Sequence, residues 1–173
     1  MVIGSQRHDA TRAIRHPDPE PATMSDFDLP ISAMNRRRHR RAIAGLIHEE
    51  RRSRGLRRLR HSHGLSLSAR SWARAICRRS RFTHGDFARR VLRFPFVLNS
   101  RGRRWRVAEN LAWAAGAEST PRKIVARWMR SRRHRAIILG DWQYTAVWTE
   151  RDAPAPGLQR DSATVVQHFG RRR

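Results

Sequence analysis

Residues 105–113 read WRVAENLAW, a run that is apolar apart from Arg106 and the central pair Glu109 and Asn110. A carboxylate inside an apolar run is costly to bury unless it is paired or hydrogen-bonded. Glu109 therefore predicts a polar partner brought in from another part of the chain. The run indicates a folded core with a polar site embedded in it.

Helical patterns precede this run. Residues 37–54 carry a narrow apolar stripe that stops at Gly55, and residues 68–79 show the i, i+3, i+4, i+7, i+8 spacing of one buried face. The segment around His84 breaks that period. Asp86 then has the residue type and position to cap a short third helix.

The patterns after the run change from helical to extended. Thr120 and Pro121 are typical of an N-cap and a first helical position, and a further short helix is expected over residues 135–139. Two strands are expected over residues 143–149 and 163–169. Because helices come first and strands last, the order predicts an α+β fold.

The chain of 173 residues is long enough for one domain with a substantial core. Residues 1–35 are rich in Pro, Asp and Arg without any period, which predicts a disordered extension. The expected domain covers residues 36–170, and residues 171–173 form a basic tail.

The formal net charge of +24 predicts a very basic surface. Such a surface attracts anionic polymers or lipids, and it attracts nucleic acid without sequence preference because no recognition device is evident. Cys77 is the only cysteine, so no disulfide can form within the chain. Neither a transmembrane span nor a secretory signal is visible in the sequence.

His84, Glu109 and His134 are the candidate site residues, because each interrupts or ends a segment that otherwise reads as structural. The three could bind zinc or another divalent cation through imidazole nitrogen and carboxylate oxygen. They could equally form a hydrogen-bonded network that holds the core in register. A third possibility is acid-base catalysis, with Glu109 as the candidate catalytic residue.

Five segments, taken in order, resemble the bacterial, SCP-like branch of the CAP superfamily, which groups cysteine-rich secretory proteins, antigen 5 and pathogenesis-related proteins. The segments are residues 46–52, 81–84, 108–113, 128–139 and 166–170. The resemblance implies an α-β-α sandwich with a small antiparallel sheet between helical layers. It also implies a central cleft containing His84, Glu109 and His134.

The resemblance carries several functional expectations. Related clefts are associated with divalent metals, usually zinc, other members bind sterols or fatty acids, and protease activity has been claimed for some. We therefore expect a domain at the cell envelope or outside the cell that binds a divalent metal or a small apolar ligand. A metal- or Glu-assisted hydrolase is the alternative, and a charge-driven binder of nucleic acid or other polyanions is the second alternative.

The sequence departs from the family pattern at Ala108, where Gly is usual, and at residues 144–148, where a Gly-rich strand is usual. No second cleft carboxylate can be placed, and Glu118 and Glu150 are candidates by residue type alone. His168 lies on the last expected strand, and its approach to the cleft depends on a strand register that the sequence does not reveal.

Overall fold

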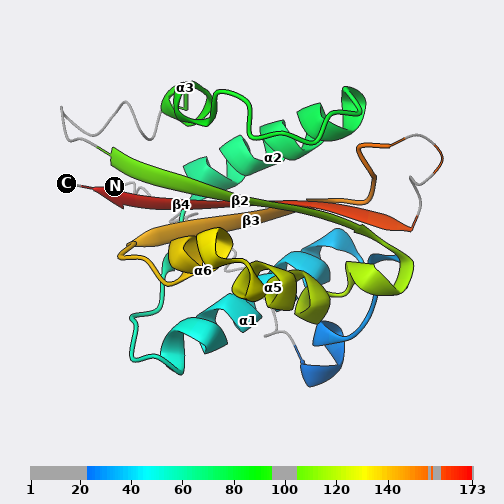
Figure 1. Ribbon diagram of the computed structural model, residues 1–173, viewed down its shortest axis with the longest axis horizontal. Helices are drawn as coiled ribbons and strands as arrows, with labels where there is room; N and C mark the ends of the chain where they lie inside the picture. Colours follow the sequence, from blue (N-terminus) through cyan, green and yellow to red (C-terminus); the bar gives the residue numbers. More distant parts are fainter. Residues whose placement is uncertain (1–22, 95–104, 156, 158–160, 173) are drawn as a thin grey trace, which may run out of the picture.

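The computed structural model describes residues 23–94, 105–155, 157 and 161–172. The helices are α1 (Arg36–Arg52), α2 (His63–Arg78), α3 (Phe87–Leu92), α5 (Pro121–Arg130) and α6 (Arg132–Ile138), with short 3-10 helices η1 (Met24–Phe27), η2 (Ile31–Ala33) and η3 (Gly116–Ser119). The strands are β1 (Arg60–His61), β2 (Trp105–Ala115), β3 (Tyr144–Glu150) and β4 (Ser162–Arg172). The sheet lies between α2 and α3 on one face and α1, α5 and α6 on the other, which confirms the α+β sandwich (Figure 1).

The sheet is mixed, which corrects the expectation of an antiparallel one. Its strand order is β1-β3-β4-β2, so β1 and β2 lie at opposite edges. Strand β4 pairs antiparallel with both β2 and β3, whereas β1 pairs parallel with β3. Strand β1 contains only two residues, and so short a pairing leaves no periodic signal in a sequence.

The helix caps read from the sequence are present. The side chain of Asp86 accepts a hydrogen bond from the backbone N–H of Arg89, and that of Thr120 accepts one from Lys123. Helix α2 begins at His63, earlier than expected, because Ser62 caps it by accepting from the backbone N–H of Leu65.

The N-terminal boundary of the fold differs from the one expected. Phe27, Ile31 and Met34 are buried, although their segment was expected to be part of a disordered extension. The backbone N–H of Ile31 donates to Ser119 Oγ at 3.0 Å, which ties η2 to η3. The apolar residues here are separated by Pro, Asp and Ser, so they show no helical or strand period. The expectation for residues 1–22 lies outside the described residues.

The C-terminal boundary also moves, because β4 continues to Arg172. Arg171 and Arg172 pair with Arg106 and Trp105 of β2. Two of the three residues expected to form a basic tail are therefore part of the sheet.

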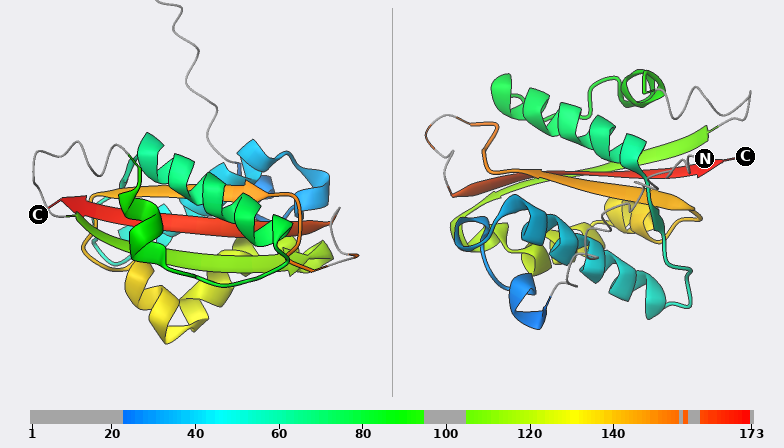
Figure 2. Two further views of the ribbon diagram at one scale, coloured as in Figure 1. Left: turned by 90° about the horizontal axis from the view of Figure 1, so that it is seen from above. Right: turned by 180° about the vertical axis from the view of Figure 1, so that it is seen from behind.

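The two faces of β2 carry different chemistry. Glu109 lies opposite His168 in the β2-β4 register, and His168 lies opposite Ala146 of β3. Because neighbouring residues of a strand point to opposite faces, Glu109 faces α2 and α3, whereas Asn110 faces α6. The two helical layers on either side of the sheet are seen from above and from behind in Figure 2.

Helix α6, which carries His134, is held at its C-terminal end by Arg51 of α1. The Arg51 side chain is almost fully buried, and its Nη1 donates to the carbonyl oxygens of Ile138 at 2.7 Å and Gly140 at 2.8 Å. These bonds satisfy carbonyl groups that a helix end leaves without intrahelical partners. Helix α1 therefore fixes the position of α6 against the sheet.

Candidate functional site

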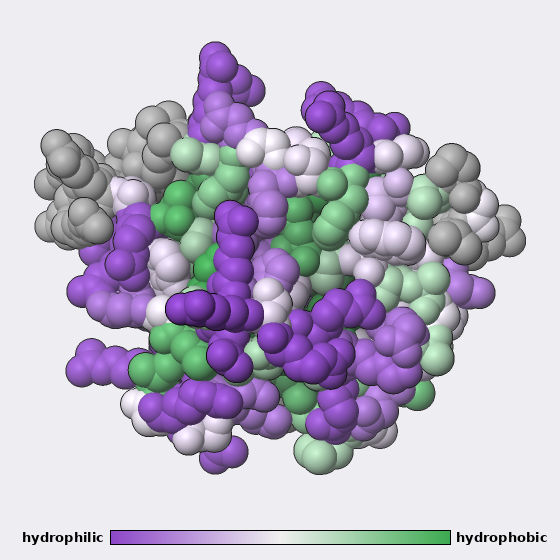
Figure 3. All heavy atoms as spheres, in the orientation of Figure 1, coloured by the Kyte–Doolittle hydropathy of each residue, from purple (hydrophilic) through white to green (hydrophobic). Residues whose placement is uncertain are grey.

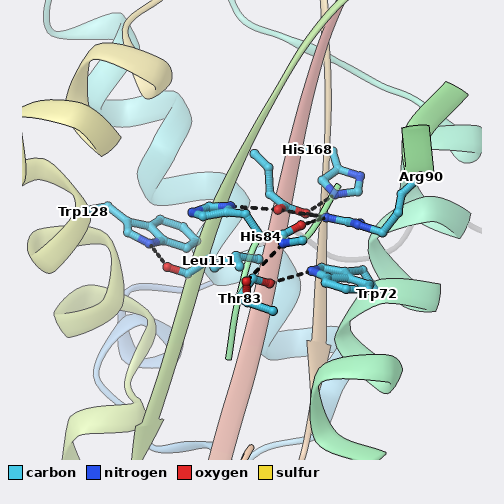
Figure 4. Close-up of polar contacts among 9 residues, drawn as sticks. Trp72, Thr83, His84, Arg90, Leu111, Trp128 and His168 are labelled. Atoms are coloured by element: carbon cyan, nitrogen blue, oxygen red, sulfur yellow. Dashed lines mark hydrogen bonds and ion pairs between the residues drawn. The ribbon is translucent and has the colours of Figure 1, made fainter. Parts of the chain in front are cut away.

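The carboxylate of Glu109 is the centre of a buried polar cluster on the α2 and α3 face. Its side chain is 1% exposed. Three side chains from separate parts of the chain donate to it: His84 from the loop between α2 and α3, Arg90 from α3, and His168 from β4 (Figure 4). The sequence predicted one polar partner for Glu109, and the structure provides three.

Arg90 supplies the positive charge of this cluster. Its Nη2 lies 3.0 Å from Oε1 and 2.9 Å from Oε2 of Glu109, and it donates to the carbonyl oxygen of His84 at 2.7 Å. The guanidinium stacks over the ring of Trp72 at 3.7 Å from the ring centroid. The same Trp72 donates through Nε1 to the carbonyl oxygen of Thr83. Trp72 and Arg90 together fix the backbone that carries His84.

Glu109 is held in its ionised form. Burial alone would raise the pKa of its carboxyl group, but the hydrogen bonds from His168 and His84, together with the charge of Arg90, lower that pKa to about 2. A carboxylate with so low a pKa is a weak base at neutral pH. Glu109 is therefore well placed to orient the side chains that donate to it, and poorly suited to act as a general base.

His168 reaches the cluster, which settles the register question left by the sequence. Its Nε2 lies 2.8 Å from Glu109 Oε2, and its ring is fully buried beside Phe87 at a centroid distance of 5.4 Å. Burial lowers the pKa of His168 and outweighs the opposing effect of Glu109. The imidazole is therefore neutral near pH 7 and donates its Nε2–H to the carboxylate.

His84 is the exposed member of the cluster. Its Nδ1 lies 2.9 Å from Glu109 Oε1, and its side chain is 42% exposed. Because the ionised carboxylate can only accept, Nδ1 carries a proton, and Nε2 is the ring nitrogen that does not contact Glu109. Gly85 permits this loop path: its φ is +54°, and a Cβ atom there would lie 3.1 Å from the Trp72 ring.

His134 approaches β2 from the opposite face of the sheet. Its backbone carbonyl accepts a 3.4 Å hydrogen bond from Nδ2 of Asn110, and its side chain is half-buried. Burial lowers the pKa of His134, and the pKa is lowered further because protonated imidazoles at His134 and His84 would repel each other. His84 and His134 thus come to β2, an edge strand, from opposite faces of the sheet. No hydrogen bond joins His134 to Glu109 among the described residues.

A metal site with three protein ligands is not assembled in the described part of the chain. No group of three His, Cys, Asp or Glu side chains is placed there so as to hold a metal ion. Both oxygens of Glu109 already accept hydrogen bonds, and a cation on either would meet the guanidinium of Arg90. With Glu109 engaged in this way, the imidazoles of His84 and His134 are the donors left among the three candidate residues.

The remaining carboxylates named from the sequence lie elsewhere. Glu150 forms ion pairs with Arg36 and Arg74, and Glu118 is exposed and forms one with Lys123.

Sequence reasoning missed Arg90. Arginines are so abundant in this chain that one more on a short helix carries no signal.

Residues 31–147 match the family model described as "CAP: Cysteine-rich secretory protein family". This chain belongs to the CAP family. The match includes each of His84, Glu109 and His134. No similar sequence was found among curated proteins.

Solved structures share the fold of this CAP domain. An outer surface protein of Borrelia burgdorferi is 18% identical with a TM-score of 0.59, over 76% of this chain and 90% of that one. A cysteine-rich secretory protein of Staphylococcus aureus is 18% identical with a TM-score of 0.58, over 78% and 38% of the two chains. An extracellular protein with an SCP domain from Bacillus anthracis is 17% identical with a TM-score of 0.57, over 87% and 44%.

The present chain thus spans less than half the length of the Staphylococcus and Bacillus proteins. Identities this low establish the common fold and nothing about ligands. Among the described residues, no helix has the length and apolar content needed to cross a membrane.

Proposed function

We propose that this CAP domain acts at the cell envelope and binds its ligand beside β2, through the imidazoles of His84 and His134. A divalent cation such as zinc is the ligand that these donors suit best. The observation that carries the proposal is the bond between Nδ1 of the exposed His84 and the buried, ionised Glu109.

A carboxylate that accepts from one ring nitrogen is the usual outer partner of a metal-binding histidine. It fixes the tautomer and the orientation of the ring and raises the basicity of the other nitrogen. Glu109 accepts the hydrogen bond of His84 Nδ1 and is such an outer partner. In the proposed site Glu109 orients the ligand His84 and does not itself bind the metal, and His134 supplies the second nitrogen. A bound zinc ion would polarise water or a ligand oxygen.

The envelope location is supported by the names of the structural relatives. Those names describe an outer surface protein, a secretory protein and an extracellular protein. Membrane and surface fractionation of cells that express the full chain tests this part. Recovery of the protein only with the cytoplasmic fraction would contradict it.

Zinc titration of chelator-washed protein, followed by calorimetry, tests the metal part. We expect one ion per chain in the wild type, and loss of binding in His84→Ala and in His134→Ala. Removing an orienting carboxylate typically costs 10-fold to 100-fold in metal affinity, so Glu109→Gln should weaken binding by about that factor.

The matched control is His63→Ala, which removes an exposed histidine at the start of α2. It should bind zinc as the wild type does. Absence of zinc uptake by the wild type, or uptake that survives loss of both cleft imidazoles, would contradict the proposed metal site.

A further inference from the structure

Strand β3 has an outer edge that is only partly paired. Strand β4 pairs with all seven residues of β3, whereas β1 on the other side pairs only with Tyr144 and Thr145. The chain then enters α2 at His63. In the described part of the chain, no strand continues β1 along the rest of β3. Figure 2 (right) shows this side of the sheet, with α2 and α1 on its two faces.

The backbone of Val147 faces this outer edge. Ser62 donates its backbone N–H to the carbonyl oxygen of Thr145 at 3.1 Å, so the backbone groups of Thr145 point toward β1. The direction of these groups repeats every second residue, so those of Val147 also point outward, whereas those of Trp148 point to β4. The next outward residue, Thr149, is fully buried. The open stretch is therefore short and centred on Val147.

The opposite edge of the sheet is protected by side chains of α5. The carbonyl oxygens of Leu111 and Trp113 in β2 accept hydrogen bonds from Trp128 Nε1 at 3.0 Å and from Arg127 Nη1 at 3.2 Å. Covering an edge strand in this way keeps it from pairing with another chain. Among the described residues, no side chain covers the outward backbone groups of Val147 with such a bond. The sheet can therefore accept a further strand there.

A groove of about 780 Å³ lies beside this open stretch. Val147 and Trp148 line it from β3, α1 lies on one side, and β1 with the start of α2 lies on the other. Helix α1 contributes Ala44 and Gly45 to the lining, and these small residues leave space near the sheet. The groove lies where a longer β1 would run.

Both walls of the groove are basic. Arg37 and Arg40 of α1 line it, and within the described ranges neither forms an ion pair within 4.0 Å. Arg40 of α1 and Arg70 of α2 lie over the ring of Trp148, at 4.0 Å and 5.3 Å from its centroid. Because side chains of a strand point alternately to its two faces, an added strand would meet arginine on each side. The other charged or titratable lining residues are Arg41, His48, Arg58, His61, His63 and the single acid Glu49.

We propose that the open edge of β3 binds an extended acidic peptide segment of a partner protein, which adds a strand beside Val147 and places its carboxylates near Arg37, Arg40 and Arg70. In strand addition, backbone hydrogen bonds supply affinity and the flanking side chains supply specificity. A second copy of this chain, with its net charge of +24, would be repelled. The site is at the other edge of the sheet from β2 and does not depend on the proposed metal site.

Fluorescence anisotropy of the full chain with a labelled, end-blocked heptapeptide that alternates glutamate with valine tests the proposal. Measurement at 0.15 M salt screens charge attraction beyond about 8 Å. The same peptide N-methylated at every amide keeps its charge but cannot donate to the Val147 carbonyl. We expect it to bind at least about fivefold more weakly.

Hydrogen exchange measured by NMR locates the added strand. The Val147 amide should exchange more slowly when the unmethylated peptide is bound, because it gains a hydrogen-bond partner. The Trp148 amide already faces β4 and should be unaffected. Unchanged exchange at Val147 in the peptide-saturated protein would contradict strand addition.

Two kinds of variant separate charge from space. Arg37→Gln/Arg40→Gln should bind the peptide about fivefold more weakly, whereas Arg79→Gln/Arg130→Gln removes the same charge from exposed positions outside the groove and should bind normally. Because Arg40 also contacts Trp148, Ala44→Leu provides a test that keeps every charge. It narrows the groove and should weaken binding while the melting temperature stays near that of the wild type.

Three further results would overturn the proposal. Undiminished binding of the N-methylated peptide would show that no strand is added. Equally tight binding of a heptapeptide that alternates lysine with valine would show that the basic walls select nothing. Full competition by an oligothymidylate of the same charge as the peptide would show a general polyanion surface instead of a peptide site.

Discussion

At the level of single residues, Glu109 determines what each of its neighbours can do. Its negative charge fixes the proton of His84 on Nδ1, receives the Nε2–H of the buried His168, and balances the charge of Arg90. The cluster contains one ionised pair and hydrogen-bond donors for both carboxylate oxygens. It therefore avoids the large penalty of an isolated buried charge.

Replacing Glu109 by Gln should destabilise the fold by about 3–5 kcal/mol, because it leaves the charge of Arg90 without a counter-charge in a site that is largely buried. Urea unfolding monitored by tryptophan fluorescence measures the change. Glu50→Gln is the control, since Glu50 forms a partly exposed i,i+4 pair with Arg54 and should cost less than about 1 kcal/mol. Equal effects of the two substitutions would contradict the role assigned to Glu109.

The pH dependence of stability follows from the same carboxylate. The pKa of Glu109 in the folded chain, about 2, is below its ordinary value of 4.5, so the group stabilises the fold above pH 4.5 and loses this effect as the pH falls toward 2. The shift corresponds to about 3 kcal/mol. The stability difference between wild type and Glu109→Gln should therefore shrink over that interval. A difference that stays constant from pH 5 to pH 2 would show that Glu109 is not the titrating group.

At the level of elements, helix α3 and the loop before it position His84, and Arg90 makes the contacts that hold these two short segments in place. Helix α3 has only six residues and is too short to be stable alone. Arg90 connects it to β2 through Glu109, to the preceding loop through His84, and to α2 through Trp72. On the other face, Trp128 of α5 donates through Nε1 to the carbonyl oxygen of Leu111 and holds that helix on β2 (Figure 4).

Arg90→Lys should loosen α3 and the loop before it while leaving the rest of the fold intact. A lysine ammonium lacks the planar guanidinium that stacks on Trp72, and the shorter side chain reaches Glu109 less well. Hydrogen exchange should become faster over residues 83–91 and stay unchanged over 121–130. Arg89→Lys, at an exposed neighbouring position of the same helix, should have no such effect. Equally faster hydrogen exchange in both variants would contradict the role assigned to Arg90.

The sequence predicted those elements whose signals are local. The caps at Asp86 and Thr120 could be read because a single side chain decides each. Strand β1 and the packing of Ile31 could not, because both depend on contacts with residues far along the chain. Likewise, the need of Glu109 for a partner could be predicted, but Arg90 and His168 depend on helix position and strand register.

At the level of the whole molecule, the positive charge is spread over the surface. Hydrophilic side chains project from much of the face seen in Figure 3, with apolar groups between them. The formal net charge is +24, and the few carboxylates of the described residues are largely engaged in ion pairs. A surface of this kind attracts polyanions through long-range electrostatics.

Binding to duplex DNA should be measurable at low salt, independent of base sequence, and steeply weaker as salt rises, because it depends on release of counterions. Fluorescence anisotropy with two unrelated duplexes at increasing potassium chloride concentration measures this. Affinity that persists at high salt, or that differs strongly between the two duplexes, would contradict a purely charge-driven interaction.

The most direct test of the cleft is an NMR titration of the Glu109 side-chain carboxyl carbon in isotopically labelled protein, with Glu109→Gln to assign the signal. The carboxyl group should remain ionised well below pH 4 and titrate with a pKa of about 2. Titration at or above the ordinary value of 4.5 would show that Arg90, His84 and His168 do not hold it as a carboxylate. The orientation of His84, and the binding site proposed on it, would then lose their basis.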